Sequence, residues 1–214
     1  MLSNIFIFIF GAGLLLAGYL IFKANNNITA KPAYSVTFLP VITHRAEPLL
    51  LGQPISNSLE RITKKPFGLK ISPGDSPVSP ERFSGYHTGV DFETFSEEQN
   101  VDVPVYAICD GQLAEKINAS GYGGVVVQRC ELKNQPITVI YGHIKLPSVI
   151  AKPGQQFVRG ETIAVLGNGF SKETDGERKH LHLGVHKGAA INIRGYVQSQ
   201  ADLSSWVNAA DYLR

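Results

Sequence analysis

Short apolar runs separated by turns fill the middle of the chain, from about residue 87 to about residue 196. The runs are rich in valine, isoleucine and tyrosine, and glycine-containing turns such as residues 121–124 and 152–154 divide them. This pattern is typical of β-strands, whereas amphipathic helices repeat their apolar residues every three to four positions. We therefore expect a mainly β, antiparallel domain, with strands at residues 103–108, 124–130, 137–141, 162–166 and 180–186.

The start of the chain has a different pattern, because residues 5–22 are apolar and carry no charge. As a helix, this segment would span roughly 27 Å, which is close to the thickness of the bilayer's hydrocarbon core. No lysine or arginine precedes it and no clear cleavage site follows at once, which favours a retained transmembrane anchor over residues 1–24. A cleaved signal peptide is the alternative interpretation.

Two further segments flank the expected domain, which covers residues 65–200. Residues 25–64 begin with a polar, asparagine-rich stretch and continue with apolar groups broken by prolines, so they predict a tether and an irregular front segment. Residues 202–213 space their apolar side chains as a helix does. This predicts a C-terminal helix within residues 201–214, capped by Asp202 or Ser204.

The composition permits one sizeable hydrophobic core, since 43% of the 214 residues are hydrophobic and 18% are charged. The 20 basic and 18 acidic residues leave a formal charge of +2, which creates no field strong enough to indicate a nucleic-acid partner. Binding must therefore depend on a local site.

The last expected strand contains the pair His180 and His182. Residues two apart in a strand point to the same side, so both imidazoles would share one surface while Leu181 and Leu183 face the core. For this motif alone, a solvent-facing strand with two incidental histidines is the alternative.

Three other candidate residues lie earlier in the chain. His87 and Asp91 have glycines beside and between them, which argues against a regular helix and for a strand or loop. His143 follows the expected strand at residues 137–141, and in a regular strand it would share a face with Tyr141 and could reach a cleft lined by the other histidines. Taken singly, each motif also fits an ordinary packed or surface histidine.

Together, these residues offer the ligands of a hydrolytic zinc site. Zinc accepts imidazole nitrogen and carboxylate oxygen, and a hydrolytic site keeps three protein ligands and one open position. His186 continues the alternation of His180 and His182, but we do not expect it to join them. Lys187 and Gly188 begin a turn there, and a fourth ligand would close the site.

Several short motifs occur in one order along the chain. They are Gly85-Tyr86-His87-Thr88-Gly89-Val90-Asp91, Val103-Pro104-Val105-Tyr106-Ala107 with Asp110-Gly111, Gly121-Tyr122-Gly123, Tyr141-Gly142-His143, Pro153-Gly154 with Gly160 and Gly167, and His180-Leu181-His182. This set resembles the lysostaphin-type (LytM-like) zinc metallopeptidases, which cleave peptide bonds in bacterial cell walls. The resemblance covers about residues 65–200.

The resemblance implies a twisted antiparallel sheet with a groove above it, in which His87, Asp91 and His182 hold one zinc ion. His143 and His180 would be the catalytic histidines beside the metal. The implied function is that of a membrane-anchored zinc metalloendopeptidase, which hydrolyses peptide bonds in bacterial peptidoglycan through a metal-activated water. The alternative is a noncatalytic module that uses the same groove to bind the wall or to activate an amidase.

The resemblance also places the domain on the extracytoplasmic side of the cell membrane, with the apolar segment as a single-pass anchor. The expected partners are then peptidoglycan peptides and the membrane. An exported location would permit a cross-strand disulfide between Cys109 and Cys130, whose positions are nearly symmetric about a turn near Ser120. Two buried free thiols are the alternative.

The chain departs from the family pattern at a few positions. Residues 93–102 form a polar, acidic stretch where many relatives turn more tightly, and this stretch would reshape one wall of the groove. Cys109 stands where a small alanine is common. None of these departures falls on an expected ligand.

Overall fold

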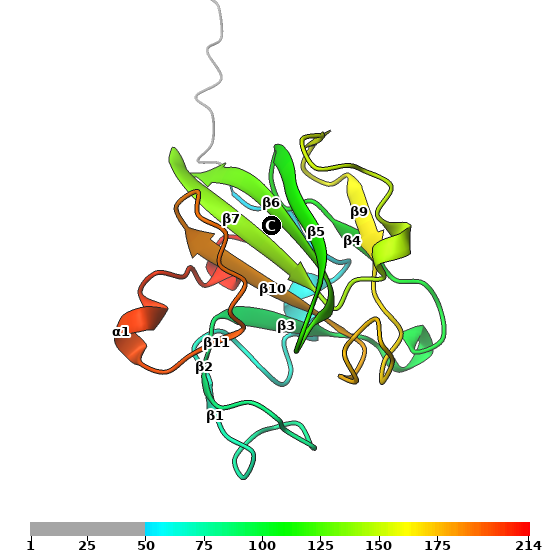
Figure 1. Ribbon diagram of the computed structural model, residues 1–214, viewed down its shortest axis with the longest axis vertical. Helices are drawn as coiled ribbons and strands as arrows, with labels where there is room; N and C mark the ends of the chain where they lie inside the picture. Colours follow the sequence, from blue (N-terminus) through cyan, green and yellow to red (C-terminus); the bar gives the residue numbers. More distant parts are fainter. Residues whose placement is uncertain (1–49) are drawn as a thin grey trace, which may run out of the picture. The chain divides into compact units, whose positions relative to one another are not determined.

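The computed structural model describes residues 50–214 (Figure 1). The expected anchor at residues 1–24, and the part of the expected tether and front segment up to residue 49, lie outside the described residues. Within residues 50–214, no helix is both long enough and apolar enough to cross a bilayer.

A six-stranded sheet forms the centre of the described part of the chain (Figure 1). Its strands lie in the order β3-β10-β7-β6-β5-β8, and every pair of neighbours is antiparallel. Their bounds are β3 (Gly89–Glu93), β5 (Gly111–Ala119), β6 (Gly123–Leu132), β7 (Gln135–Gly142), β8 (Gln156–Phe157) and β10 (His180–Lys187). The prediction of a mainly β, antiparallel fold is confirmed.

Two smaller sheets and several short helical turns complete the described structure. One sheet joins β1 (Lys70–Ile71), β2 (Gly85–His87) and β11 (Tyr196–Val197), and the other pairs β4 (Pro104–Tyr106) with β9 (Thr162–Val165). The helical turns are η1 (Ser58–Arg61), η2 (Ser96–Glu98), η3 (Leu146–Ser148), α1 (Gln200–Leu203) and η4 (Ala209–Asp211). β2 ends at His87, one of the candidate histidines, two residues before β3 of the central sheet begins.

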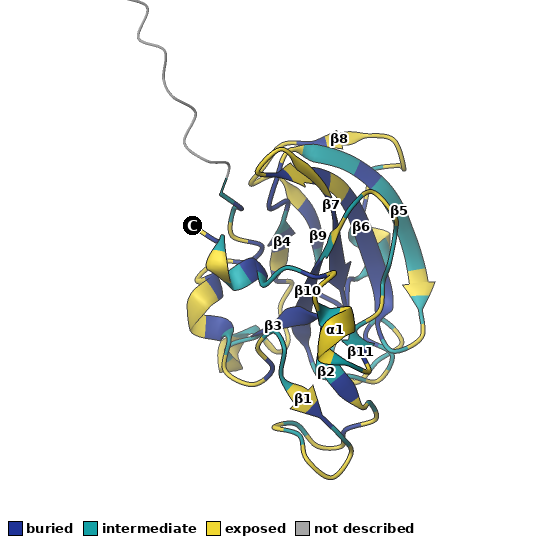
Figure 2. Ribbon diagram, turned by 90° about the vertical axis from the view of Figure 1, so that its left-hand side faces the viewer, coloured by how far each residue is buried: buried dark blue, intermediate teal, exposed yellow. Residues whose placement is uncertain are grey.

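Most residues of the central strands β6, β7 and β10 are buried (Figure 2), and their side chains belong to two hydrophobic clusters. Val126 belongs to the main core, whereas its neighbours Val125 and Val127 belong to a second, smaller core that includes Trp206. This alternation follows from the two-residue repeat of a strand, whose successive side chains point to opposite faces. The main core also contains residues of β4 and β9, so this pair of strands packs on that face of the sheet.

The irregular front segment contributes to the main core where the structure describes it. Leu51 and Ile55 are buried in this core, and Leu51 forms a parallel bridge with Leu213 near the end of the chain. Residues 50–64 therefore pack as part of the same hydrophobic unit that holds the sheet.

The end of the chain forms less helix than its apolar spacing predicts. The helix α1 is a single turn capped by Ser199, whose side chain accepts a hydrogen bond from the backbone of Asp202, so the expectation that Asp202 or Ser204 caps it is wrong. Beyond α1 the backbone pairs with β10, because the amide of Val207 donates to the carbonyl of Val185. This pairing, together with burial of Trp206, ends the helix.

A disulfide joins Cys109 and Cys130, 21 residues apart in sequence. The hairpin of β5 and β6 brings the two cysteines together, since Gly111 lies opposite Cys130. Of the two possibilities that the sequence leaves open, the structure has the cross-strand bridge.

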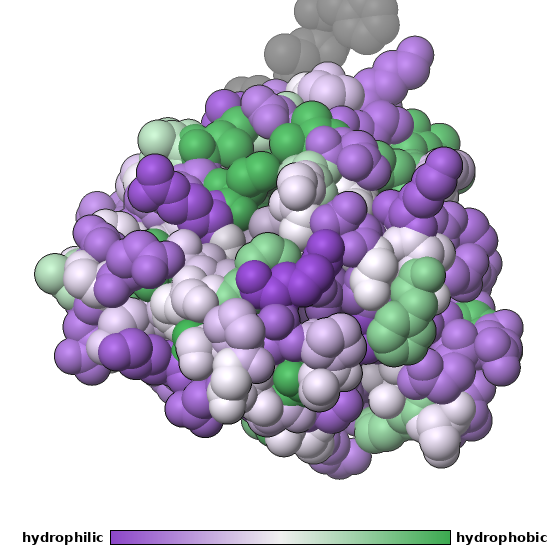
Figure 3. All heavy atoms as spheres, turned by 60° about the horizontal axis from the view of Figure 1, so that its bottom comes forward, coloured by the Kyte–Doolittle hydropathy of each residue, from purple (hydrophilic) through white to green (hydrophobic). Residues whose placement is uncertain are grey.

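The surface of the described residues is mostly hydrophilic on the face that carries the lower loops of Figure 1. Figure 3 shows this face, on which hydrophobic residues gather in smaller groups among polar ones.

Candidate metal centre

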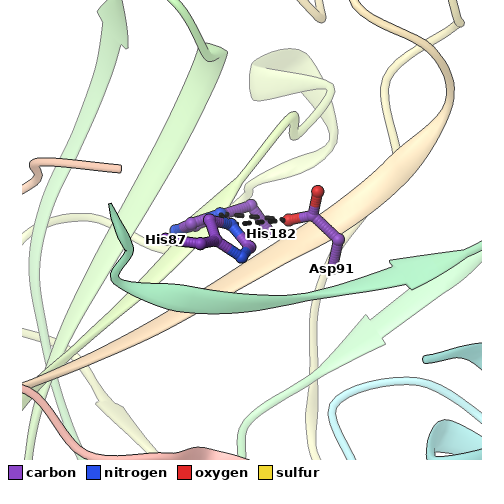
Figure 4. A group of neighbouring side chains, drawn as sticks. All are labelled: His87, Asp91 and His182. Carbon is purple, nitrogen blue, oxygen red and sulfur yellow. Dashed lines mark hydrogen bonds and ion pairs between the residues drawn. The ribbon is translucent and has the colours of Figure 1, made fainter. Parts of the chain in front are cut away.

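Three strands bring His87, Asp91 and His182 together from distant parts of the chain (Figure 4). His87 ends β2, Asp91 lies in the middle of β3, and His182 lies near the start of β10. β3 and β10 are paired so that His182 lies directly opposite Asp91. All three side chains are buried.

The atoms that face one another in this cluster have the spacing of metal ligands. His87 Nε2 lies 3.0 Å from His182 Nδ1. Asp91 Oδ1 lies 3.2 Å from each of these nitrogens. Ligand atoms bound to zinc at about 2.0–2.1 Å in a tetrahedron are about 3.3 Å apart, so the three atoms fit three corners of such a site. Two imidazole nitrogens and a carboxylate oxygen are also ligand types that zinc accepts.

The hydrogen bonds of the two imidazoles leave the clustered nitrogens free to bind a cation. His87 Nδ1 lies 3.2 Å from the carbonyl oxygen of Pro66, which can only accept, so Nδ1 carries the proton and Nε2 has a lone pair. On the other side, His182 Nε2 lies 3.3 Å from the hydroxyl of Tyr122, which can accept its proton, and in that tautomer Nδ1 has the lone pair. Such outer contacts fix the tautomer and the ring orientation of histidine ligands.

The second oxygen of Asp91 is bound on the other side of the cluster. Asp91 Oδ2 accepts a hydrogen bond of 2.8 Å from Arg178 Nη2 and lies 3.3 Å from His180 Nε2. Burial alone would raise the pKa of this carboxyl, but the electrostatic effect of the neighbouring imidazoles of His180 and His87 holds it well below its ordinary value. Asp91 is therefore an ionised, doubly anchored carboxylate.

His180 lies next to this cluster on the same face of β10 as His182. Leu181 and Leu183, the residues between and beyond them, are fully buried in the main core, as the strand alternation predicts. His180 Nδ1 lies 2.9 Å from the carbonyl oxygen of Arg178, so the proton is on Nδ1 and Nε2 is the basic nitrogen.

His143 also reaches the site, but by a different route from the predicted one. Tyr141 points into the main core, where its hydroxyl donates to Gln128 Oε1, so His143 and Tyr141 do not share a face. β7 ends at Gly142, and His143 has a left-handed backbone with φ of 62°, which turns its side chain toward the site. Its ring centroid lies 4.2 Å from that of His180.

The imidazole of His143 is buried and neutral. Burial, with a smaller contribution from His180, holds its pKa well below the ordinary value. Its Nδ1 has no hydrogen-bond partner among the described residues. His186 Nδ1, away from the cluster, is likewise without a partner, so the place of His143 in the site rests on its position beside His180.

A cavity of about 360 Å³ opens beside the cluster. The lining includes His143, His180, His182, Tyr122 and Tyr196. Asp91 and His182 also line this cavity, so the cluster borders an open space, as a site that takes up a further ligand requires. A larger hollow, of about 500 Å³, lies beside the disulfide, and its lining contains no histidine.

Glycines on the neighbouring strands make room for the imidazole of His182. A Cβ atom on Gly89 would lie 2.6 Å from His182 Nε2 and 2.6 Å from the carbonyl oxygen of Leu183. A Cβ atom on Gly142 would lie 2.5 Å from the ring of Tyr122, which in turn contacts His182. A larger residue at position 89 would displace the ring of His182, and one at position 142 would displace the ring of Tyr122.

The structure brings together all five candidate residues of the sequence analysis and adds three that the sequence did not indicate. The added residues are Arg178, which binds Asp91, its partner Glu93, and Tyr122, which contacts His182. Glu93 opens the acidic stretch that departs from the family pattern, and it lies opposite His180 across β3 and β10. The only signal for Tyr122 was its place in the glycine-flanked motif, and Arg178 had none.

His186 lies outside the cluster. Its ring packs edge-on against Trp206, with centroids 4.9 Å apart, and its partial burial lowers its pKa. This arrangement is that of a packed histidine at the end of β10.

A known protein family matches the part of the chain that contains the site. The profile of peptidase family M23 matches residues 85–193, just over half of the 214 residues. The matched span includes the cluster together with His143 and His180. Among proteins of curated function, none is significantly similar to the chain in sequence.

Three of the similar solved structures are bacterial proteins. The catalytic domain of the antimicrobial peptidase lysostaphin from Staphylococcus simulans is 19% identical, with a TM-score of 0.45, and the match covers 70% of this chain and 86% of that one. Helicobacter pylori Csd3 is 24% identical, with a TM-score of 0.44, covering 70% of this chain and 35% of that one. A zinc containing peptidase from Vibrio cholerae is 22% identical, with a TM-score of 0.42, and the match covers 64% of this chain and 37% of that one. The chain thus spans little more than a third of the length of the latter two.

Proposed function

Because the chain belongs to peptidase family M23, we propose that it is a zinc metalloendopeptidase that hydrolyses peptide bonds in bacterial peptidoglycan. The membership confirms the resemblance carried by the sequence motifs. The observation that most supports the proposed activity is the cluster of His87, Asp91 and His182, whose facing atoms lie 3.0–3.2 Å apart beside an open cavity.

In this proposal His87 Nε2, His182 Nδ1 and Asp91 Oδ1 hold one zinc ion. Each ligand has a contact on the side away from the metal position. Pro66 contacts His87, Tyr122 contacts His182, and Arg178 contacts Asp91. When bound, zinc supplies Lewis acidity that polarises a carbonyl oxygen and activates water for attack.

The two remaining histidines move protons beside the metal. His180 presents its basic Nε2 toward the cluster, and the neutral His143 lies against it. A neutral imidazole accepts a proton from the attacking water and, once protonated, gives it to the leaving amine. The charged form also stabilises the oxyanion that develops on the substrate.

The proposed substrate and location rest on different grounds. Peptidoglycan as the substrate is supported by the lysostaphin-type order of motifs along residues 85–182. An extracytoplasmic location, with the apolar segment at residues 5–22 as a single-pass anchor, is supported by the disulfide, since such bonds persist in oxidising compartments.

Digestion of purified peptidoglycan by the full chain in detergent tests the proposal. Mass spectrometry of the products should reveal new amino termini, and these should disappear with a zinc chelator and return when zinc is added. No new amino terminus at any zinc concentration would refute the peptidase. Zinc-independent co-sedimentation with the wall, without cleavage, would instead indicate a binding module.

A further inference from the structure

Arg178 lies immediately behind the proposed metal site, at the entrance to β10. Its side chain is only 13% exposed, and its Nη2 donates a hydrogen bond of 2.8 Å to Asp91 Oδ2. Its Nε lies 3.0 Å and 2.9 Å from the two carboxylate oxygens of Glu93. One guanidinium therefore bridges a proposed ligand and a second carboxylate.

This bridge uses the planar shape of arginine. The guanidinium presents several N–H groups in a rigid fork, which can bind two carboxylates at fixed angles, whereas a lysine ammonium is a single flexible point charge. An arginine is not deprotonated in proteins, so the charge of Arg178 is permanent.

A cation beside a metal site requires an explanation, because its charge alone disfavours a second cation. Glu93 offsets that charge, and the Arg178–Glu93 pair as a whole is neutral. The pair therefore acts through its geometry and not through its charge. Arg178 binds Oδ2 of Asp91, so Oδ1 alone faces the two imidazole nitrogens.

We propose that Arg178, anchored by Glu93, is a positioning residue that restricts Asp91 to binding the metal through one oxygen. The inference rests on the proposed zinc function. Restricting the carboxylate to one oxygen leaves the fourth corner of the tetrahedron to the cavity, whereas a second oxygen from the carboxylate would add a fifth donor and crowd that corner. Arg178 also fixes the position of Oδ2 relative to His180 Nε2, 3.3 Å away.

The neighbouring residue Lys179 provides a matched control. Its side chain is also buried, but the ammonium donates to the backbone carbonyls of Glu98 and Val101, at 3.0 Å and 2.6 Å, and has no contact with the cluster. Replacing it removes a buried cation one position away without touching Asp91.

The test compares the zinc affinity of the metal-free full chain in detergent, measured by competition with a chromogenic chelator, between wild type and variants. The double variant Arg178→Met with Glu93→Gln removes one positive and one negative charge, so the net charge near the metal is unchanged. We expect its zinc dissociation constant to rise 10–100-fold, the usual effect of losing an outer contact to a ligand.

Arg178→Lys, which keeps the charge and loses the planar fork of N–H groups, should show a smaller rise of the zinc dissociation constant. Lys179→Met should bind zinc as wild type does, even where its melting temperature falls.

The visible absorption of the cobalt-substituted chain provides a readout that a purely structural role would not change. Wild type should give the intense bands of four-coordinate cobalt, and Arg178→Lys should give the weaker bands of a five-coordinate ion, as Asp91 binds through both oxygens. Wild-type zinc affinity in both Arg178 variants, or an unchanged cobalt spectrum in Arg178→Lys, would overturn the inference. If the double variant does not fold, as judged by circular dichroism of the metal-free chain, Arg178→Lys decides. Failure of wild type itself to bind zinc would refute the proposed function instead.

Discussion

His87 Nε2 lies 3.0 Å from His182 Nδ1, although the two residues are 95 positions apart in sequence. The contact with the carbonyl of Pro66 places the ring proton of His87 on Nδ1, and the Tyr122 hydroxyl can accept the ring proton of His182 at Nε2, a tautomer in which two lone pairs face each other. Burial lowers the pKa of His182 to about 4, so its ring is neutral at neutral pH and keeps a lone pair on one nitrogen. A metal cation is the partner that satisfies both lone pairs together with the ionised Asp91.

Loss of either proton-transfer histidine should abolish cleavage while zinc stays bound. In His143→Ala or His180→Ala, we expect peptidoglycan turnover to fall about 10²–10⁴-fold, the usual contribution of a general acid or base. Zinc content should remain that of wild type, because neither residue belongs to the cluster of three. His186→Gln is the matched control, since this histidine packs on Trp206 away from the site, and it should keep full activity. Unaltered turnover in the first two variants would contradict the assigned roles.

The buried pair of Lys65 and Glu81 should stabilise the fold only as a pair. Their charged atoms lie 2.5 Å apart, and both side chains are almost fully buried. Lys65→Met leaves a buried carboxylate without its cation and should lower the free energy of unfolding by about 3 kcal/mol. Adding Glu81→Gln should restore part of this loss. Urea unfolding followed by the fluorescence of Trp206, the single tryptophan, measures both, and strictly additive effects would show that the pair is not coupled.

The ion pair of Arg61 and Glu98 should make stability depend on acid pH. The hydrogen bonds from Arg61 hold the pKa of Glu98 below its ordinary value of about 4.5, so the stabilisation is complete above that pH and is lost as pH falls through the folded-state pKa. Glu98→Gln should lower the free energy of unfolding by about 1.5 kcal/mol at pH 7. The difference from wild type should shrink in urea titrations below pH 4.5, and a difference independent of pH would argue against the pair.

Removing the disulfide should cost stability and leave the metal centre intact. The bond closes a segment of 21 residues, and Cys109→Ser with Cys130→Ser should lower the free energy of unfolding by about 3 kcal/mol. Zinc affinity should not change, because Cys130 lies opposite Ile137 on β7 whereas the site lies beyond Gly142 at the other end of that strand. A variant with weakened zinc binding but wild-type stability would contradict this separation of stability from function.

The shared face of His180 and His182 could be predicted from the sequence, because strand alternation is a local property of the backbone. The turn near Ser120 was also predicted, but β5 was not among the predicted strands, and the predicted strand at residues 103–108 pairs with β9 instead of β6. The alignment of Asp91 opposite His182 could not be derived from local pattern, since the register of two strands far apart in sequence is set by tertiary packing.

Other parts of the site depend on local backbone and side-chain geometry, which the periodicity of apolar residues does not predict. His143 reaches the cavity through a positive φ, against the alternation that would have placed it beside Tyr141. Arg178 precedes β10, and its long side chain reaches back to Asp91. The C-terminal helix was overestimated, because the backbone at Val207 pairs with β10 where helical spacing alone suggested continuation.

The number of zinc ions bound per chain tests the metal centre most directly. Titration of the metal-free full chain in detergent should show one tightly bound zinc ion. His182→Ala and Asp91→Ala should each weaken that binding by more than the roughly 100-fold that an outer contact can cost. A wild-type chain that binds no zinc, or a chain that binds it equally well without His182 or Asp91, would contradict the proposed site.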